Sequence, residues 1–285
     1  MNDLSVDESS KERHHLSKPM NKKMVIMMTA SLSGLLFWGC QTTGGELAKK
    51  DPEKSVKVRT QMAAEYIRNG NLDAAKRSLD QALATDSKDS TANMMMGVLL
   101  QQEGSDINLA RADHYFSRAL SIDPKNAQAR NNYGTYLYQV KRYDDAIRQL
   151  SIAGAALGYD QRHRALENLG RIYLIKGDVP NAEKSFKQAL QVNRDSTVSM
   201  IELAEIFYLQ KNNIAARQLY EQFVLLVGQQ NQGARALWIG LRIARANEDK
   251  PGMYVLVNQL RTLFPNSQEF QRYLQLQFNT EAVWK

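Results

Sequence analysis

Residues Leu166–Leu190 read LENLGRIYLIKGDVPNAEKSFKQAL, and this segment indicates the architecture of the chain more directly than any other. Its apolar and small residues recur every three or four positions, which places them on one stripe of a first helix and one stripe of a second. The first stripe contains Leu166, Leu169, Gly170 and Tyr173, and the second contains Ala182, Phe186 and Ala189. The segment therefore predicts two packed helices joined by a short turn.

The residue types explain how the two helices fit together. Gly170 and Ala182 are small, so we expect the helices to approach closely there, with Tyr173 and Phe186 filling the space beside that contact. Asp178 is well placed to cap the second helix, because a carboxylate accepts hydrogen bonds from free amides of the first turn. The proline that follows two residues later is tolerated at that position.

The same pattern recurs from about Val56 onward, with a period of about 34 to 37 residues. The matching residues are Met62, Ala63, Tyr66, Ala75, Leu79 and Ala82 in the first copy; Met96, Gly97, Leu100, Ala112, Phe116, Ala119 and Pro124 in the second; Tyr133, Gly134, Leu137, Ala146, Leu150 and Ala153 in the third; Leu203, Ala204, Phe207, Ala216, Tyr220 and Phe223 in the fifth; and Leu237, Gly240, Leu241, Ala244, Val257 and Leu260 in a degenerate sixth. This pattern resembles the tetratricopeptide repeat. The resemblance implies an all-α, right-handed superhelical solenoid of about six repeats over residues 56–265.

The end of such a stack needs a cap, because each repeat leaves an apolar face open. Residues 266–285 follow the last repeat, and they contain Phe270, Leu274 and Phe278 at helical spacing with polar residues between them. We interpret this segment as a capping helix and tail.

The beginning of the chain has the layout of a secretory leader. Lys22 and Lys23 precede an apolar run of about fifteen residues, and Gly39 and Cys40 follow it. The run is shorter than a bilayer-spanning helix of roughly 20 residues. Its end resembles the lipobox of bacterial lipoproteins, although Phe37 and Trp38 are larger than the usual residues. Cys40 is the single cysteine of the chain, and lipidation would account for it. The alternative is a membrane anchor or a buried helix.

These features divide the N-terminal part of the chain. We interpret residues 1–39 as an N-terminal extension and a cleaved signal peptide, with translation starting at Met20, and residues 40–55 as a lipidated tether. Gln41 follows the cysteine, where Asp is the usual signal for retention in the inner membrane. By that resemblance the expected location is the periplasmic face of the outer membrane, with the lipid on Cys40 as the membrane contact.

Composition argues against several classes of function. The chain has 285 residues, 43% hydrophobic and 24% charged, with a net charge of +7. The first 40 residues carry five Lys or Arg and four Asp or Glu, so the remainder keeps +6. This charge is diffuse, and the sequence has neither a basic block nor a recognition motif for nucleic acid. We therefore expect no nucleic-acid partner.

Catalytic and metal-binding patterns are equally weak. His114 and His163 lie in different copies and lack the spacing of metal ligands, and the sequence holds no catalytic triad, phosphate loop or H-E-x-x-H motif. The carboxylate pairs at Asp144–Asp145 and at Glu202 and Glu205 are expected to be caps and solvated faces. We expect a protein that is not an enzyme and that uses no cofactor, metal or small-molecule substrate.

Repeat arrays of this kind bind extended peptides or partner surfaces along a groove lined by the first helices. Helical geometry offsets the groove positions from the packing stripe. The candidates are Met94, Val98 and Gln101 in the second copy; Asn131, Thr135 and Tyr138 in the third; Arg164, Glu167 and Arg171 in the fourth; Ile201, Glu205 and Tyr208 in the fifth; and Arg235, Trp238, Arg242 and Arg245 in the sixth. The last set is the most suggestive, because Trp and Arg anchor many interfaces. The alternative is that Trp238 belongs to the core of a degenerate repeat.

The lipobox, tether, six repeats and terminal helix together resemble the type IV pilus biogenesis/stability lipoproteins, the PilF or PilW family of pilotins. The resemblance runs from Met20 to the end of the chain. It implies a protein that binds subunits of the type IV pilus secretin and promotes their localisation and multimerisation in the outer membrane. Two alternatives stay open: a periplasmic lipoprotein adaptor for peptidoglycan enzymes or outer-membrane protein assembly, and a hydrolase with an unrecognised site.

Overall fold

The computed structural model describes residues 51–279 and 284. Over that range the regular structure is thirteen α-helices and one short 3-10 helix, Gln229–Asn231. The leader, Cys40 and most of the expected tether lie outside the described residues. None of the helices in this range combines the length and the apolar character needed to cross a membrane.

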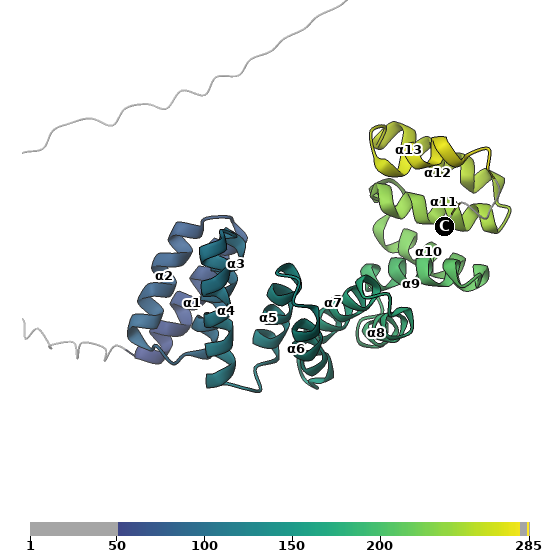
Figure 1. Cartoon of the computed structure of the whole chain (residues 1–285). Helices are drawn as coiled ribbons and strands as arrows, with labels where there is room; N and C mark the ends of the chain where they lie inside the picture. Colours follow the sequence, from purple (N-terminus) through teal and green to yellow (C-terminus); the bar gives the residue numbers. More distant parts are fainter. Residues whose placement is uncertain (1–50, 280–283, 285) are drawn as a thin grey trace, which may run out of the picture. The chain divides into compact units, whose positions relative to one another are not determined.

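Twelve of the helices form six consecutive pairs (Figure 1). The first helices of the pairs are α1 (Pro52–Arg68), α3 (Ser90–Glu103), α5 (Ala127–Gln139), α7 (Arg162–Ile175), α9 (Thr197–Leu209) and α11 (Ala234–Ala246). The second helices are α2 (Leu72–Thr85), α4 (Asp106–Ile122), α6 (Tyr143–Ala155), α8 (Val179–Val192), α10 (Asn213–Val227) and α12 (Lys250–Leu263). Each pair packs on the next, and α13 (Gln268–Leu276) packs on α11 and α12. This arrangement confirms an all-α tetratricopeptide-repeat solenoid with a terminal helix.

The close approach predicted within each repeat is present. A Cβ atom added at Gly170 would lie 2.7 Å from the Phe186 ring, and one added at Gly134 would lie 2.5 Å from Leu150. In the sixth repeat the contact differs, because Gly240 approaches Tyr220 of the preceding second helix. Small residues therefore set the helix separation in every one of these contacts.

The turns also follow the sequence signals. The Asp178 carboxylate caps α8 by accepting a hydrogen bond from the Asn181 amide at 3.2 Å, as predicted. The residue before the N-cap position of the second helix takes a left-handed backbone conformation in five of the turns, at Gly70, Lys141, Gly177, Lys211 and Glu248. Two of these five are glycines, and three are residues with long side chains.

Two boundary predictions need correction. Helix α1 begins at Pro52, inside the segment expected to be tether, because the Asp51 carboxylate accepts a hydrogen bond from Lys54 N and caps the helix. At the other end, Phe278 is 91% exposed because α13 stops at Leu276. Leu274 is also exposed, and the residues of α13 that pack on the core are Phe270, Tyr273 and Leu276.

Candidate partner-binding face

The predicted groove residues lie on the first helices of five repeats. Helix α3 carries Met94, Val98 and Gln101; α5 carries Asn131, Thr135 and Tyr138; α7 carries Arg164 and Arg171; α9 carries Ile201 and Tyr208; and α11 carries Arg235, Trp238, Arg242 and Arg245. We call the surface formed by these residues the first-helix face. Arg164, Arg171, Arg235 and Tyr138 are exposed, and Val98, Gln101, Thr135 and Arg245 are partly buried.

Six more of these residues are buried: Met94, Asn131, Ile201, Tyr208, Trp238 and Arg242. Of the two remaining candidates, Glu167 on α7 is buried and accepts a hydrogen bond from the Ser196 hydroxyl at 2.6 Å, and Glu205 on α9 is partly buried. Met94 belongs to a core cluster and lies 3.4 Å, through its sulfur, from the Asn132 side-chain amide. Its assignment as an exposed contact is corrected. The reason is that successive first helices contact one another directly, so a side chain on the flank of one helix is covered by the next. The same stacking covers Asn131 between α5 and α7, where it accepts a hydrogen bond from Asn168 at 3.5 Å.

The structure brings three candidates from α3 and α5 to one hollow. Val98, Gln101 and Thr135 line a space of about 270 Å³ together with three polar neighbours, Gln102, Asn132 and Gln139. The side chains of Gln101 and Gln139 are hydrogen-bonded at 2.9 Å. Amide and hydroxyl groups dominate this hollow, so it suits hydrogen bonding to a polypeptide backbone.

A charged network joins α9 to α11. Arg235 binds both oxygens of Glu202, at 2.9 and 2.8 Å, and reaches Glu205 at 2.6 Å. Arg242, which is almost fully buried, pairs with the other oxygen of Glu205. Burial alone would lower the pKa of Arg235, but the hydrogen bonds and charges of the two glutamates outweigh burial and raise it.

The prediction that Glu202 and Glu205 sit on a solvated face is therefore wrong. Glu202 is only 6% exposed, and both carboxylates face the arginines of the next repeat. Their spacing along α9 marks them as neighbours on one side of that helix, but their partners lie about 30 residues further along the chain and could not be read from local sequence.

An aromatic cluster lies beside this network, and sequence reasoning missed its main member. Trp284 is fully buried and stacks on Trp238 with the ring centroids 5.4 Å apart. Arg245 lies over the Trp284 ring at 4.3 Å, and the ring of Tyr273 meets it edge-on at 6.2 Å. Trp238 is thus buried, in agreement with the alternative that it belongs to the core, and Trp284 from the end of the chain stacks on it. The sequence signal that could have indicated this contact is a large apolar residue, Trp284, close to the end of the given sequence.

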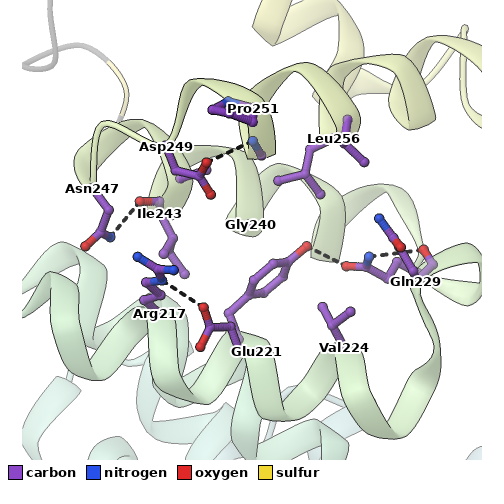
Figure 2. Close-up of a pocket in the computed structure, with 15 residues that line it drawn as sticks. Arg217, Glu221, Val224, Gln229, Gly240, Ile243, Asn247, Asp249, Pro251 and Leu256 are labelled. Carbon is purple, nitrogen blue, oxygen red and sulfur yellow. Dashed lines mark hydrogen bonds and ion pairs between the residues drawn. The ribbon is translucent and has the colours of Figure 1, made fainter.

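A second hollow lies away from the first-helix face, between α10, α11 and α12 (Figure 2). Its volume is about 380 Å³, and Val224, Ile243 and Leu256 contribute apolar walls. Tyr220 also lines it and donates a hydrogen bond to the Gln232 side chain at 2.5 Å. Burial strongly raises the pKa of the Tyr220 hydroxyl, which therefore stays protonated. An apolar hollow with a neutral phenol offers packing rather than acid–base chemistry.

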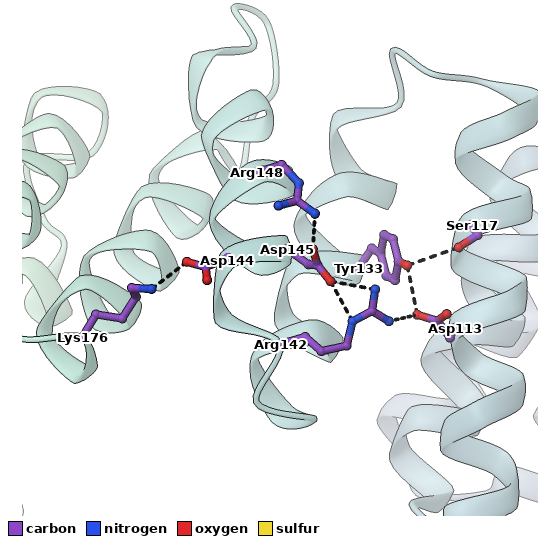
Figure 3. A network of polar contacts seen from close by, with 8 residues as sticks. All are labelled: Asp113, Ser117, Tyr133, Arg142, Asp144, Asp145, Arg148 and Lys176. Atoms are coloured by element: carbon purple, nitrogen blue, oxygen red, sulfur yellow. Dashed lines mark hydrogen bonds and ion pairs between the residues drawn. The ribbon is translucent and has the colours of Figure 1, made fainter.

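A surface network ties α4, α5 and α6 together (Figure 3). Arg142 binds Asp113 of α4 at 2.9 Å and Asp145 of α6 at 2.7 Å, and Asp113 also accepts a hydrogen bond from the Tyr133 hydroxyl at 2.9 Å. The hydrogen bond from Arg142 is the main reason why the pKa of Asp145 is lowered. The sequence predicted Asp144 and Asp145 to be caps or solvated carboxylates. Asp145 instead links α6 to Arg142, whereas Asp144 is 76% exposed and pairs with Lys176.

Within the described range, no group of three or more His, Cys, Asp and Glu side chains is arranged to hold a metal ion. His114 and His163 lie on α4 and α7, in different repeats. The polar features that the structure does bring together are the hollow between α3 and α5, the charged network of α9 and α11, and the surface network of α4, α5 and α6.

Comparisons with known proteins agree with this architecture. The tetratricopeptide-repeat family profile matches residues 56–89, 115–148 and 163–196. The type IV pilus assembly protein PilF of Pseudomonas aeruginosa is 32% identical over 238 residues, covering 82% of this chain and 92% of PilF. A solved structure of that PilF superimposes with a TM-score of 0.74, covering 79% of this chain and 99% of PilF. The crystal structure of PilW, described as a widely conserved type IV pilus biogenesis factor, is 27% identical with a TM-score of 0.66, covering 77% and 98%.

Proposed function

Because this chain belongs to the tetratricopeptide-repeat family of type IV pilus assembly proteins that includes PilF, we propose that it acts in type IV pilus biogenesis. The specific role that we propose is that of a pilotin, a lipoprotein of the outer membrane that binds secretin subunits and promotes their localisation and multimerisation there. The observation that carries the proposal is the extent of the similarity, since 32% identity spans 92% of PilF.

The proposed mechanism needs no bond chemistry. Acyl chains on Cys40 would anchor the protein in the membrane, because each buried CH₂ contributes about 0.8 kcal/mol to membrane attachment. Several chains together would make this attachment effectively permanent. The solenoid supplies a preformed surface, so little ordering entropy is lost when a partner docks.

The first-helix face is the proposed docking surface for the secretin. It offers the exposed guanidinium groups of Arg164 and Arg171 on α7, the amide-lined hollow between α3 and α5, and the exposed Arg235 of α11. Backbone carbonyls and acidic side chains of an extended segment are the natural partners of such donors.

The proposal is tested by affinity capture of the lipidated protein from detergent-solubilised outer membranes, with the secretin detected by immunoblot. We expect the wild-type chain to retain the secretin, and Arg164→Glu/Arg171→Glu to reduce retention at least tenfold. A matched control, Arg77→Glu/Arg261→Glu, makes the same charge change at exposed positions of the second helices α2 and α12. We expect it to behave as the wild type. Absence of the secretin from the wild-type capture would contradict the proposal.

A further inference from the structure

The buried aromatic cluster at the C-terminal end of the first-helix face has the composition of a peptide-binding site. We define the indole pocket as Tyr208 of α9, Trp238, Arg242 and Arg245 of α11, and Tyr273 of α13. We propose that this pocket binds a segment of a partner polypeptide through a large aromatic side chain, and that Trp284 of the chain's own tail occupies the pocket until the partner displaces it.

The ring contacts show what the pocket accepts. The Trp284 indole lies flat against Trp238 at 5.4 Å, under the guanidinium of Arg245 at 4.3 Å and beside the edge of Tyr273 at 6.2 Å. A second guanidinium, that of Arg242, lies over the Trp238 ring at 5.5 Å from its centroid. A flat, electron-rich ring satisfies a slot of this kind far better than an aliphatic side chain, because stacking and cation–π attraction both depend on the π face.

Two backbone carbonyls near the end of the chain, those of Asn279 and Trp284, are contacted by side chains of the first helices. Arg245 donates a hydrogen bond to the backbone carbonyl of Asn279 at 2.7 Å, and the Tyr208 hydroxyl lies 3.4 Å from the backbone carbonyl of Trp284. These donors come from the first helices α9 and α11 and recognise main-chain atoms that every polypeptide carries. A segment of another protein could therefore make the same two contacts.

The fit of Trp284 leaves two buried polar atoms unsatisfied. The indole Nε1 of Trp284 and the Nε of Arg242 have no hydrogen-bond partner among the described residues. Both atoms are donors, so one carbonyl or carboxylate oxygen placed near each would satisfy them. No described residue supplies these acceptors, and a partner segment that does supply them would compete effectively with Trp284.

The position of the indole pocket favours a role in binding over a role only as an end cap of the solenoid. Trp238 and Arg242 lie on the face that also carries the exposed Arg235, and Arg242 is fixed by its pair with Glu205. The pocket is therefore continuous with the proposed docking surface. The inference rests on the proposed function only for the identity of the displacing partner, a secretin segment with a tryptophan or a similar aromatic side chain.

A binding assay with the chain's own tail as probe tests the pocket without any secretin. A fluorescein-labelled peptide, NTEAVWK, reproduces Asn279–Lys285 and is titrated against the full chain by fluorescence anisotropy. We expect the Trp284→Ala variant to bind it at least tenfold more tightly than the wild type, in which the pocket is filled. The matched control is Phe278→Ala, which alters an exposed aromatic residue of the same tail and is expected to bind as weakly as the wild type.

Two further variants make the assay specific. Removing the pocket floor in Trp238→Ala/Trp284→Ala, or replacing the tryptophan of the peptide by alanine, is expected to lower the affinity at least tenfold. If Trp284→Ala binds the peptide no better than the wild type, the inference is overturned. If that variant loses its helical circular dichroism, the added peptide must restore it, and failure to do so overturns the inference as well.

One further result would change which polypeptide we propose as the ligand of the indole pocket. Sedimentation that shows a wild-type dimer, which Trp284→Ala abolishes, would identify a second copy of this chain as the partner and overturn the assignment to a different protein. Failure of the peptide assay leaves the secretin capture experiment unaffected, because that experiment does not require an aromatic segment. The two proposals can therefore fail separately.

Discussion

At the scale of single residues, the repeats depend on positions where a missing side chain is essential. Gly170 lies against the ring of Phe186, and Gly134 lies against Leu150, at distances that leave no room for a methyl group. Because interiors are packed to crystal-like density, the neighbouring ring must move if a Cβ atom is added. The periodic glycines were therefore readable from the sequence as close contacts.

Replacing Gly170 by alanine tests this contact. In a helix, alanine is more stable than glycine by about 1 kcal/mol, so replacing an exposed helical glycine by alanine would stabilise the fold. We expect Gly170→Ala instead to lower the free energy of unfolding by about 1–3 kcal/mol, because overpacking displaces Phe186. Urea denaturation monitored by circular dichroism measures the change. In a Phe186→Leu background the cost should shrink; a stabilising effect of Gly170→Ala in the wild-type background would refute the contact.

At the scale of elements, the turn between the helices of a repeat requires one residue in the left-handed region. Gly177 fulfils this with φ of +74°, whereas Lys211 occupies the equivalent position with φ of +62°. A side chain in this conformation costs roughly 1–2 kcal/mol, a cost that glycine avoids. The packed helices on either side hold Lys211 in place nonetheless.

Exchanging the residue types at these turns should produce opposite effects. No atom lies within 4 Å of a Cβ atom added at Gly177, so Gly177→Ala reports backbone strain alone. We expect it to cost about 1 kcal/mol, and Lys211→Gly to be neutral or stabilising by up to about 1 kcal/mol. Thermal unfolding of the two variants measures both changes. Equal destabilisation by both substitutions would show that the side chains, rather than the backbone, control these turns.

The link between α4 and α6 gives a dependence on pH. The pKa of Asp145 is lowered in the folded state, mainly by the hydrogen bond from Arg142. Its contribution to stability is therefore complete above the unfolded-state pKa of about 3.9, and it is lost as the pH falls through the lower folded value.

We expect Asp145→Asn to reduce the free energy of unfolding by up to about 1 kcal/mol at pH 7, since partly exposed ion pairs contribute little more. The difference from the wild type should narrow below about pH 4 as the wild-type carboxylate becomes protonated. Urea titrations at pH 7 and pH 3 measure it. Asp144→Asn, a change of a 76% exposed carboxylate one residue earlier, is the control and should stay within about 0.5 kcal/mol of the wild type at pH 7. A difference for Asp145→Asn that grew at low pH would contradict the assignment.

Periodicity made the helix pairs predictable, because the stripe of Leu166, Leu169 and Tyr173 is local information. The start of α1 at Pro52 was not predicted, because the tether was assigned from its polar composition and the capping residue Asp51 was not considered. The docking of Trp284 onto Trp238 and the pairing of Arg235 with Glu202 join residues that are far apart along the chain. Such contacts follow from how repeats stack, and a single repeat does not encode them.

At the scale of the whole molecule, the proposed function needs two parts of the chain, a lipidated Cys40 that binds the membrane and a solenoid surface that binds the partner. The similarity to PilF covers 82% of this chain, and the first-helix face runs over five of the six repeats and ends at the indole pocket. In the proposed function, the lipid on Cys40 would bring that face to the outer membrane, the proposed site of secretin assembly. Neither part alone would suffice, because an unanchored solenoid would bind its partner without directing it.

The most direct measurement is therefore the location of secretin multimers in cells whose only copy of this protein carries Cys40→Ala. We expect the variant to keep the helical circular dichroism of the wild type, since α1 begins twelve residues after Cys40. We also expect membrane fractionation to find the multimers in the inner membrane, with the wild-type allele at equal expression restoring them to the outer membrane. Normal outer-membrane multimers in the Cys40→Ala cells would contradict the account.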